Sequence, residues 1–343
     1  MDNRKSNATR IIGILSAMHF MTDLICAFAV YSMIAEGKAV RVVMYNFCAF
    51  VLQMPLGLLA DAMRSRRQED NAILFIGLSI PLTLSGLLNF PVWVFGLGNA
   101  LFHVGGGIIT IHKDHENRYE GRGLGTFVAP GAIGLFLGQV IAGNSIIMRI
   151  GITAVMTVLF VLLYTEISRN NPERKTAALE IDEEALKAII LTLLVVILRS
   201  YVGFAVSFEW KHGVFLGFLA VLCVAGGKTL GGFVKPVLGY RKTVVVTLVA
   251  AARCYLSGSI IPLGLAALLL FNMTMPITLC MLAERMKHLE GFAFGILTFG
   301  LFIGFYIKYL FPVFVENTLL IGVAGSLISL LLLLPLTGSR KES

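Results

Sequence analysis

Ionisable side chains inside long apolar runs are the residues of this sequence that could do chemistry. Asp23 and His19 stand four residues apart in the run 11–34, a spacing that puts both on one face of a helix. Arg199 lies at a similar depth in the run 185–209. A charge at this depth is expensive, at about 2.5–3.5 kcal/mol on membrane-insertion scales, so each of these residues needs a reason to be there. Their types allow proton exchange and anion recognition.

We interpret Asp23 as a proton-coupling carboxylate. Burial raises the pKa of a carboxyl group and a nearby cation lowers it, so a group that alternates between two such environments can take up a proton and release it. His19 would tune that carboxylate or relay its proton. Arg199 keeps its charge and could pair with Asp23 or bind an anionic group of a substrate with two parallel hydrogen bonds. A static Asp23–Arg199 pair is the structural alternative.

Other polar side chains at mid-run depth extend the candidate substrate site. They are His103, Asn99, Asn46, Gln53 and Asn272. Hydrogen bonds between helices are the alternative role for all five. Lys228 lies closer to the end of an apolar run, where we expect its long side chain to reach the membrane surface.

The elements that must position these residues are membrane-spanning helices. Of the 343 residues, 57% are hydrophobic and only 14% are charged, too few to cover a soluble globule of this length. A bilayer core needs about 20 apolar residues per helix, and backbone groups in lipid must be paired within the helix. The sequence predicts twelve spans, at 11–34, 40–62, 72–89, 92–112, 123–143, 145–166, 185–209, 213–233, 242–258, 260–284, 291–312 and 316–337.

Basic residues predict the orientation of these spans. Of the 28 Lys and Arg, 20 lie in or at the edge of the two termini and the five loops on their side, and three at the six opposite loops. Both termini are therefore predicted to be cytoplasmic. The polar stretch 167–184 divides the chain into two six-helix bundles, 1–166 and 185–343. The two bundles contain similar short sequences: Gly134-Leu-Phe-Leu-Gly138 in span five matches Gly300-Leu-Phe-Ile-Gly304 in span eleven.

A basic loop follows the second span and carries the strongest motif. It reads Gly57-Leu58-Leu59-Ala60-Asp61-Ala62-Met63-Arg64-Ser65-Arg66-Arg67. The glycine allows close helix approach, and the aspartate can face the positive N-terminus of another helix. This motif resembles the loop signature of the major facilitator superfamily. The resemblance implies that Gly57, Asp61, Arg64, Arg66 and Arg67 form a cytoplasmic gate. In the second copy, after span eight, Pro236 replaces the aspartate, so that half of the gate is expected to be altered.

Shorter motifs resemble the fosmidomycin-resistance-like branch of that superfamily. They include His19-Phe20-Met21-Thr22-Asp23, Gly98-Asn99-Ala100-Leu101-Phe102-His103 and Leu198-Arg199-Ser200. The resemblance implies two pseudo-symmetric six-helix bundles, proton-coupled efflux of small organic molecules with possible drug resistance, and a monomer in a bacterial-type plasma membrane.

Other functions have little support in the sequence. Nothing matches a nucleophile elbow, a zinc-protease motif, a phosphate loop or a dinucleotide fingerprint, so we predict no enzyme, no cofactor and no metal site. The basic loops are a topology signal, so we predict no nucleic-acid partner. The segment His112-Lys113-Asp114-His115 is interpreted as a solvated loop. Three classes stay open: a proton-coupled exporter, an importer or uniporter of a small anionic metabolite, and a non-transporting sensor or scaffold.

Overall fold

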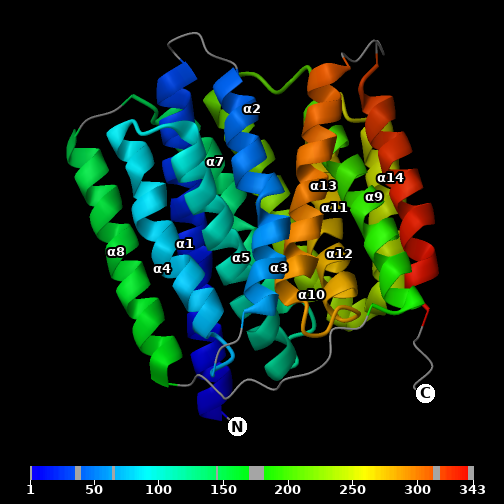
Figure 1. The fold of residues 1–343 in the computed structure, drawn as a ribbon. Coiled ribbons are helices and arrows are strands. Elements are labelled where there is room, and N and C mark those ends of the chain that lie inside the picture. The colour runs from blue at the N-terminus through cyan, green and yellow to red at the C-terminus, as the bar shows by residue number, and fades with distance from the viewer. Residues whose placement is uncertain are drawn as a thin grey trace.

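The computed structural model describes residues 2–34, 40–63, 66–143, 146–169, 181–311 and 317–338. Within these residues every regular element is helical (Figure 1). The elements are α1 (Asp2–Ile34), α2 (Val40–Asn46), η1 (Phe47–Val51), α3 (Gln53–Ala62), α4 (Asp70–Leu84), η2 (Ser85–Leu88), α5 (Val92–Glu116), α6 (Arg122–Val128), α7 (Pro130–Val140), α8 (Ile146–Arg169), α9 (Glu183–Ala205), α10 (Gly213–Leu256), α11 (Ile261–Asn272), α12 (Thr274–Ala283), α13 (Glu290–Leu310), α14 (Leu319–Leu333) and η3 (Leu334–Leu336).

The helices confirm the predicted polytopic membrane fold. Across the described residues, 11 helical stretches are long and apolar enough to cross a bilayer. One of them, α10, has 44 residues and is long enough for two crossings. Its backbone leaves the helical conformation at Gly239 (φ 75, ψ 167), between the spans predicted at 213–233 and 242–258. Counting α10 as two spans gives the twelve of the prediction.

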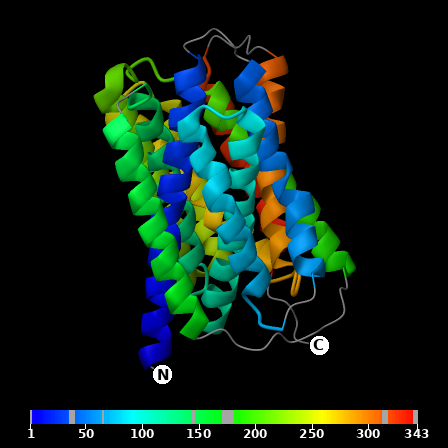
Figure 2. The same cartoon turned by 60° about the vertical axis from the view of Figure 1, so that its left-hand side comes forward.

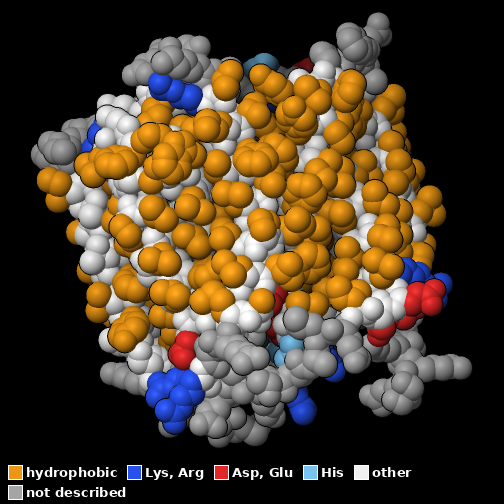
Figure 3. All heavy atoms as spheres, in the orientation of Figure 1, with side chains coloured by type: hydrophobic (Ala, Val, Ile, Leu, Met, Phe, Trp, Pro, Cys, Tyr) orange, Lys and Arg blue, Asp and Glu red, His pale blue; other side chains and the backbone are white. Residues whose placement is uncertain are grey.

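The outer surface of the molecule is apolar, as contact with lipid requires. Hydrophobic side chains cover the middle of the face shown in Figure 3, and the charged side chains of that face gather toward its two ends. Large apolar residues that a soluble protein would bury stand exposed here, among them Val237 (76%), Phe215 (71%) and Leu331 (68%). In water such a large apolar surface would be unfavourable, so these residues are expected to face lipid.

The helices fall into two groups that face each other. In Figure 1 helices α1–α8 lie toward the left and most of α9–α14 toward the right, and Figure 2 shows the molecule with the α1–α8 side turned forward. We call these groups the N bundle and the C bundle. The predicted linker 167–184 includes the end of α8 and the start of α9, and its residues 170–180 lie outside the described part of the chain. Helix α1 begins and α14 ends at the same end of the molecule, which we call the terminal face (Figure 1).

Several spans are interrupted near their middle. The second span passes through a π-helical turn, η1, between α2 and α3. The fifth span breaks at Ala129 between α6 and α7, and the tenth breaks at Met273 between α11 and α12. Interruptions of this kind free backbone carbonyls inside a membrane protein, where they must find other donors.

Candidate functional site

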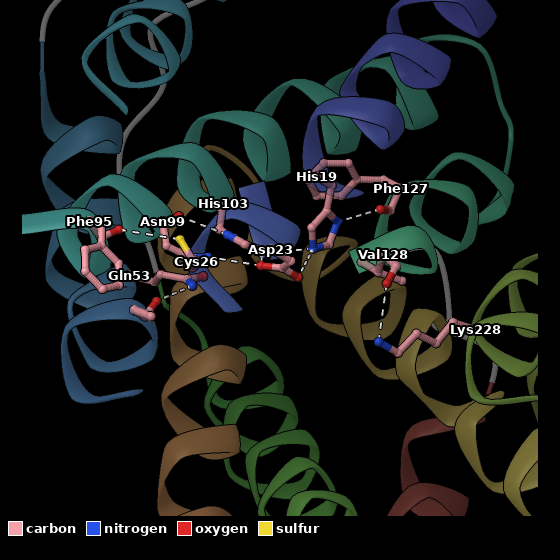
Figure 4. Close-up of polar contacts among 11 residues, drawn as sticks. His19, Asp23, Cys26, Gln53, Phe95, Asn99, His103, Phe127, Val128 and Lys228 are labelled. Atoms are coloured by element: carbon pink, nitrogen blue, oxygen red, sulfur yellow. Dashed lines mark hydrogen bonds and ion pairs between the residues drawn. The ribbon is translucent and has the colours of Figure 1, made fainter. Parts of the chain in front are cut away.

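Four predicted site residues meet in the middle of the N bundle (Figure 4). The Asp23 carboxylate lies 3.2 Å from His19 Nε2, and its other oxygen accepts a hydrogen bond of 3.0 Å from Asn99 Nδ2. His103 Nε2 lies 2.9 Å from His19 Nε2 and 3.8 Å from Asp23. All four side chains are buried. Helix α1 supplies His19 and Asp23, and α5 supplies Asn99 and His103. We call these four residues the imidazole–carboxylate cluster.

Backbone carbonyls determine which ring nitrogens of the two histidines carry protons. His19 Nδ1 lies 2.7 Å from the carbonyl oxygen of Phe127, and His103 Nδ1 lies 2.9 Å from that of Asn99. A carbonyl can only accept, so both Nδ1 atoms must be donors. A neutral imidazole has one N–H, which leaves both Nε2 atoms with a bare lone pair. Two lone pairs and a carboxylate oxygen therefore converge, and a proton shared between them is required for this geometry to be attractive.

Pro130 creates the break that supplies these carbonyls. Proline has no N–H to give to the carbonyl four residues earlier, so the helix ends at α6 and resumes as α7. The three carbonyls of residues 126–128 accept hydrogen bonds from Ser16, His19 and Lys228 in turn. The break thus orients an imidazole of α1 and also receives a lysine from the C bundle.

The donor set of the cluster also has the composition of a metal site. One nitrogen from each of His19 and His103 and an oxygen of Asp23 lie within 4.8 Å of one another. Two imidazoles and a carboxylate suit divalent cations such as Zn²⁺ or Mn²⁺. We had predicted no metal site. The 2.9 Å separation between the two Nε2 atoms is the length of a hydrogen bond, so a proton alone is enough to explain the geometry.

The other predicted substrate-site residues form no hydrogen bond or ion pair with this cluster in the described part of the chain. Arg199 is only 7% exposed, and within the described residues it forms no ion pair with Asp23 and its Nη1 has no hydrogen-bond partner. Gln53 is fully buried and donates to the carbonyl of Ala49, while its Oε1 has no partner. Asn46 and Asn272 each donate to a carbonyl of their own helix. The structure thus gathers four of the eight predicted residues.

At the terminal face, the two bundles are joined through Asp61. Its carboxylate oxygens accept hydrogen bonds from the backbone N–H groups of Gly291 (2.9 Å) and Phe292 (2.8 Å). These are the first N–H groups of α13, which have no partner within their own helix. Gly57 packs directly on the backbone of Gly291, and a side chain there would collide with it. The contact between α3 and α13 therefore depends on a glycine and an aspartate of the loop motif.

Two arginines of the same motif lie beyond this contact, in the described residues that follow α3. Arg66 and Arg67 are exposed in the loop after α3, and the backbone N–H of Arg67 donates to Asp70. Arg64 lies outside the described residues.

A second connection at the terminal face was not predicted. His112 lies 3.2 Å from Glu69 through Nδ1 and 3.7 Å from Glu290 of α13 through Nε2. Lys113 forms a salt bridge of 3.2 Å with Glu69. Burial by itself raises the pKa of Glu69, but the adjacent His112 and Lys113 outweigh it and hold that pKa below its usual range. Glu69 therefore stays ionised between two cations.

The segment 112–115 is thus not the solvated loop that we expected. It forms the last turn of α5, with Lys113 and Asp114 buried. The prediction failed because a short polar run looks the same whether water or other bundle elements cover it. The one available signal was charge balance, since three acidic residues at or near the helix ends of this face match the basic segment: Glu69, Glu116 and Glu290.

The second copy of the loop motif is built differently, at the position where Pro236 replaces the aspartate. The N-terminus of α6 is held by Asp114 of its own bundle, which accepts from the backbone N–H groups of Gly121 (2.7 Å) and Gly123 (2.8 Å). Gly232 of α10 still packs on the backbone of Gly121 and Gly125. Close packing is therefore kept in both copies, but only the first carries a hydrogen-bonded aspartate across the bundles.

Comparison with known proteins identifies the fold through solved structures rather than through sequence similarity. No family model matches the chain, and no curated protein sequence is detectably similar to it. The fucose:proton symporter FucP of E. coli superposes with a TM-score of 0.66 over 96% of this chain and 98% of its own, at 11% identity. The human organic anion transporter MFSD10 gives 0.63 over 96% and 99%, also at 11% identity. A bacterial homologue of the iron transporter ferroportin, outward-facing, gives 0.58 over 95% and 99%, at 15% identity.

These structures define the class. FucP is itself described as a major facilitator superfamily transporter, and the chain matches its whole length. The protein has the major facilitator fold, with twelve spans in an all-helical membrane domain. At these identities the likeness concerns the fold, and the resemblance to the fosmidomycin-resistance-like branch remains a prediction from the motifs.

Proposed function

We propose that this protein is a secondary active transporter of small organic molecules, coupled to protons through the imidazole–carboxylate cluster. The observation that carries the proposal is the convergence of two bare Nε2 atoms and the Asp23 carboxylate, which needs a proton at its centre. A site that gains or loses that proton changes its charge by one unit in a buried environment. Such a change alters the energy of neighbouring contacts far more than it would in water.

Alternating access is supported by how the bundles meet. At the terminal face, glycines bring the backbones of α3 and α13 together, and the same holds for α6 and α10. Toward the opposite face, the bundles meet through aromatic side chains, Phe47 with Phe302 and Phe136 with Phe218. Side-chain contacts can part by rotation, whereas a backbone contact parts only when helices move. The structure is thus firmly closed at the terminal face.

The direction of transport is proposed from the sequence motifs, whose resemblance implies efflux by proton antiport. Uptake or uniport of a small anionic metabolite is the alternative, and the structural neighbour FucP is a proton symporter. A non-transporting sensor or scaffold has less support, since it gains nothing from a buried cluster that needs a bound proton. We propose that the protein is a monomer in a bacterial-type plasma membrane and that its terminal face lies on the cytoplasmic side.

The test is proton flux in proteoliposomes. Purified protein is reconstituted with a pH-sensitive dye inside, and a panel of metabolites and antibiotics is added with and without an imposed pH gradient. We expect at least one compound to move protons with the wild-type protein and none with Asp23→Asn. The matched control is Glu209→Gln, which removes an exposed carboxylate at a helix end. Proton flux at the wild-type level in Asp23→Asn would refute the coupling role of Asp23. Mn²⁺ is included in the panel to test whether the imidazole–carboxylate cluster binds a metal cation instead of a proton.

A further inference from the structure

Lys228 lies at the contact between the bundles rather than in lipid. We expected this lysine to reach the membrane surface, but it lies beside α6 of the N bundle. The Cβ that a side chain at Gly125 would add lies 2.8 Å from the Lys228 carbonyl oxygen. Its Nζ points across the interface to the carbonyl oxygen of Val128, at 3.4 Å (Figure 4). That single long hydrogen bond uses one of the three protons of the ammonium group.

Lys228 shares this part of the interface with Arg199. The Lys228 ammonium is within electrostatic range of both the Arg199 guanidinium and the Asp23 carboxylate. Among the described residues neither cation forms an ion pair, and Arg199 Nη1 is buried without a hydrogen-bond partner. In the described part of the chain Asp23 forms no salt bridge with either cation, and its oxygens contact His19 and Asn99 instead.

A buried guanidinium and a half-buried ammonium in electrostatic range of each other, with no salt-bridge partner in the described residues, are unfavourable. Each has lost part of its hydration, and each repels the other, so their juxtaposition destabilises the empty protein. An anion between them would reverse both effects. A guanidinium offers a planar pair of donors for a carboxylate or phosphonate, and an ammonium adds a point charge.

We propose that Arg199 and Lys228 form an anion-binding site at the bundle interface, and that the transported molecule is a small organic anion with a carboxylate or phosphonate group. The substrate assignment rests on the proposed transport function, whereas anion binding itself does not. The site lies on the C bundle and faces the imidazole–carboxylate cluster of the N bundle. An anion held there would contact the half of the molecule that must move against the cluster.

Binding to the purified full-length protein in detergent tests the site. The probes are benzoate and phenylphosphonate, with inorganic phosphate and acetate as smaller anions, and benzamide and benzylamine as neutral and cationic counterparts of the same shape. We expect the anions to raise the melting temperature and the neutral and cationic probes to leave it unchanged. No response to any anion, or an equal response to benzamide, would overturn the proposal.

Variants assign the binding to these residues. Lys228→Met and Arg199→Gln should each raise the dissociation constant for the tightest anion by about tenfold or more, as expected for a lost charged hydrogen bond. Lys228→Met should melt no lower than the wild-type protein when no anion is present, because it removes an unpaired cation. The control is Arg253→Met, an exposed cation of the same helix, which should bind as wild type does. Unchanged affinity in both site variants would refute the assignment.

Asp23→Asn separates this proposal from the proposed function. It should abolish proton flux but keep anion binding, since it removes only a negative charge near Lys228. If no anion binds while wild-type protein still moves protons in an Asp23-dependent way, the substrate class is wrong and the transport function stands. If anions bind but no proton flux is found, the anion-binding site stands and the proposed transport function is wrong.

Discussion

Gly131 is the residue that leaves room for the imidazole–carboxylate cluster. It stands in the first turn of α7, and a Cβ at this position would collide with His19 Nε2 and Asp23 Oδ2. Gly134 and Gly138 continue the same contact along α1, against the backbone of Phe20 and Leu24. This glycine seam does more than permit helix packing, because a side chain at its first member would displace His19 or Asp23 of the proposed proton site.

Replacement of Gly131 by alanine should therefore impair both stability and proton coupling. The added methyl group forces His19 or Asp23 to move, and overpacking of this kind costs about 1–3 kcal/mol. Gly151→Ala in α8 is the matched control, since nothing lies within 4 Å of its Cβ and alanine favours a helix by about 0.5–1 kcal/mol. Thermal melting and the proton-flux assay measure the two effects. A Gly131→Ala protein as active and stable as Gly151→Ala would contradict this.

Glu69 gives a pH-dependent prediction at the terminal face. Its pKa is lowered in the folded protein, so the stability that it contributes is complete above its unfolded pKa of about 4.3 and is lost as the pH falls through the lower folded value. Glu69→Gln removes this carboxylate, while His112 keeps Glu290 and Lys113 keeps Glu116. The substitution should therefore cost about 1–3 kcal/mol at neutral pH, as for lost hydrogen bonds to charged groups.

Melting curves of the wild-type protein and Glu69→Gln across pH check this. The gap between their melting temperatures should narrow as the pH falls below about pH 4, near the ordinary pKa of a glutamate. Glu209→Gln should show no gap. A gap that narrows as the pH rises would point to deprotonation of His112, rather than protonation of Glu69, as the controlling step.

At the level of whole elements, two aspartates cap two helices in different ways. Asp61 of α3 caps α13 across the bundles, while Asp114 of α5 caps α6 within one bundle. The first bond must break if the bundles separate at the terminal face, and the second can persist. If the loop motif is a gate, as we propose, Pro236 marks the half whose helix cap does not oppose separation of the bundles.

Hydrogen exchange distinguishes the two caps. Asp61→Ala should speed exchange of the Gly291 and Phe292 amides by about fivefold, since a lost cap costs about 1 kcal/mol. Asp114→Ala should speed exchange at Gly121 and Gly123 and leave α13 unchanged. If Asp114→Ala affects α13 as strongly as Asp61→Ala does, the two caps are not independent and this account of the gate is wrong.

At the scale of the whole molecule, the distribution of basic residues predicts its orientation. With the terminal face in the cytoplasm, green fluorescent protein fused to the C-terminus should fluoresce, and alkaline phosphatase fused there should be inactive. Alkaline phosphatase fused after His212, between α9 and α10, should be active. The reverse pattern would show that the positive charges mislead in this chain.

The sequence by itself determined the membrane class, the spans and the facing of His19 and Asp23. All three depend on local information, because in lipid each helix must satisfy its own backbone and residues four apart share a face. The gate aspartate was also readable, from a motif at a helix end.

Only the tertiary structure decided which helices meet at the site. His103 bonds to His19, and Arg199 stays apart from Asp23, because glycine contacts and the break at Pro130 set how close the helices approach. The same packing buries Lys113 and brings Lys228 to the interface between the bundles. Hydropathy and residue spacing describe one helix at a time, so they do not predict the distance between two helices.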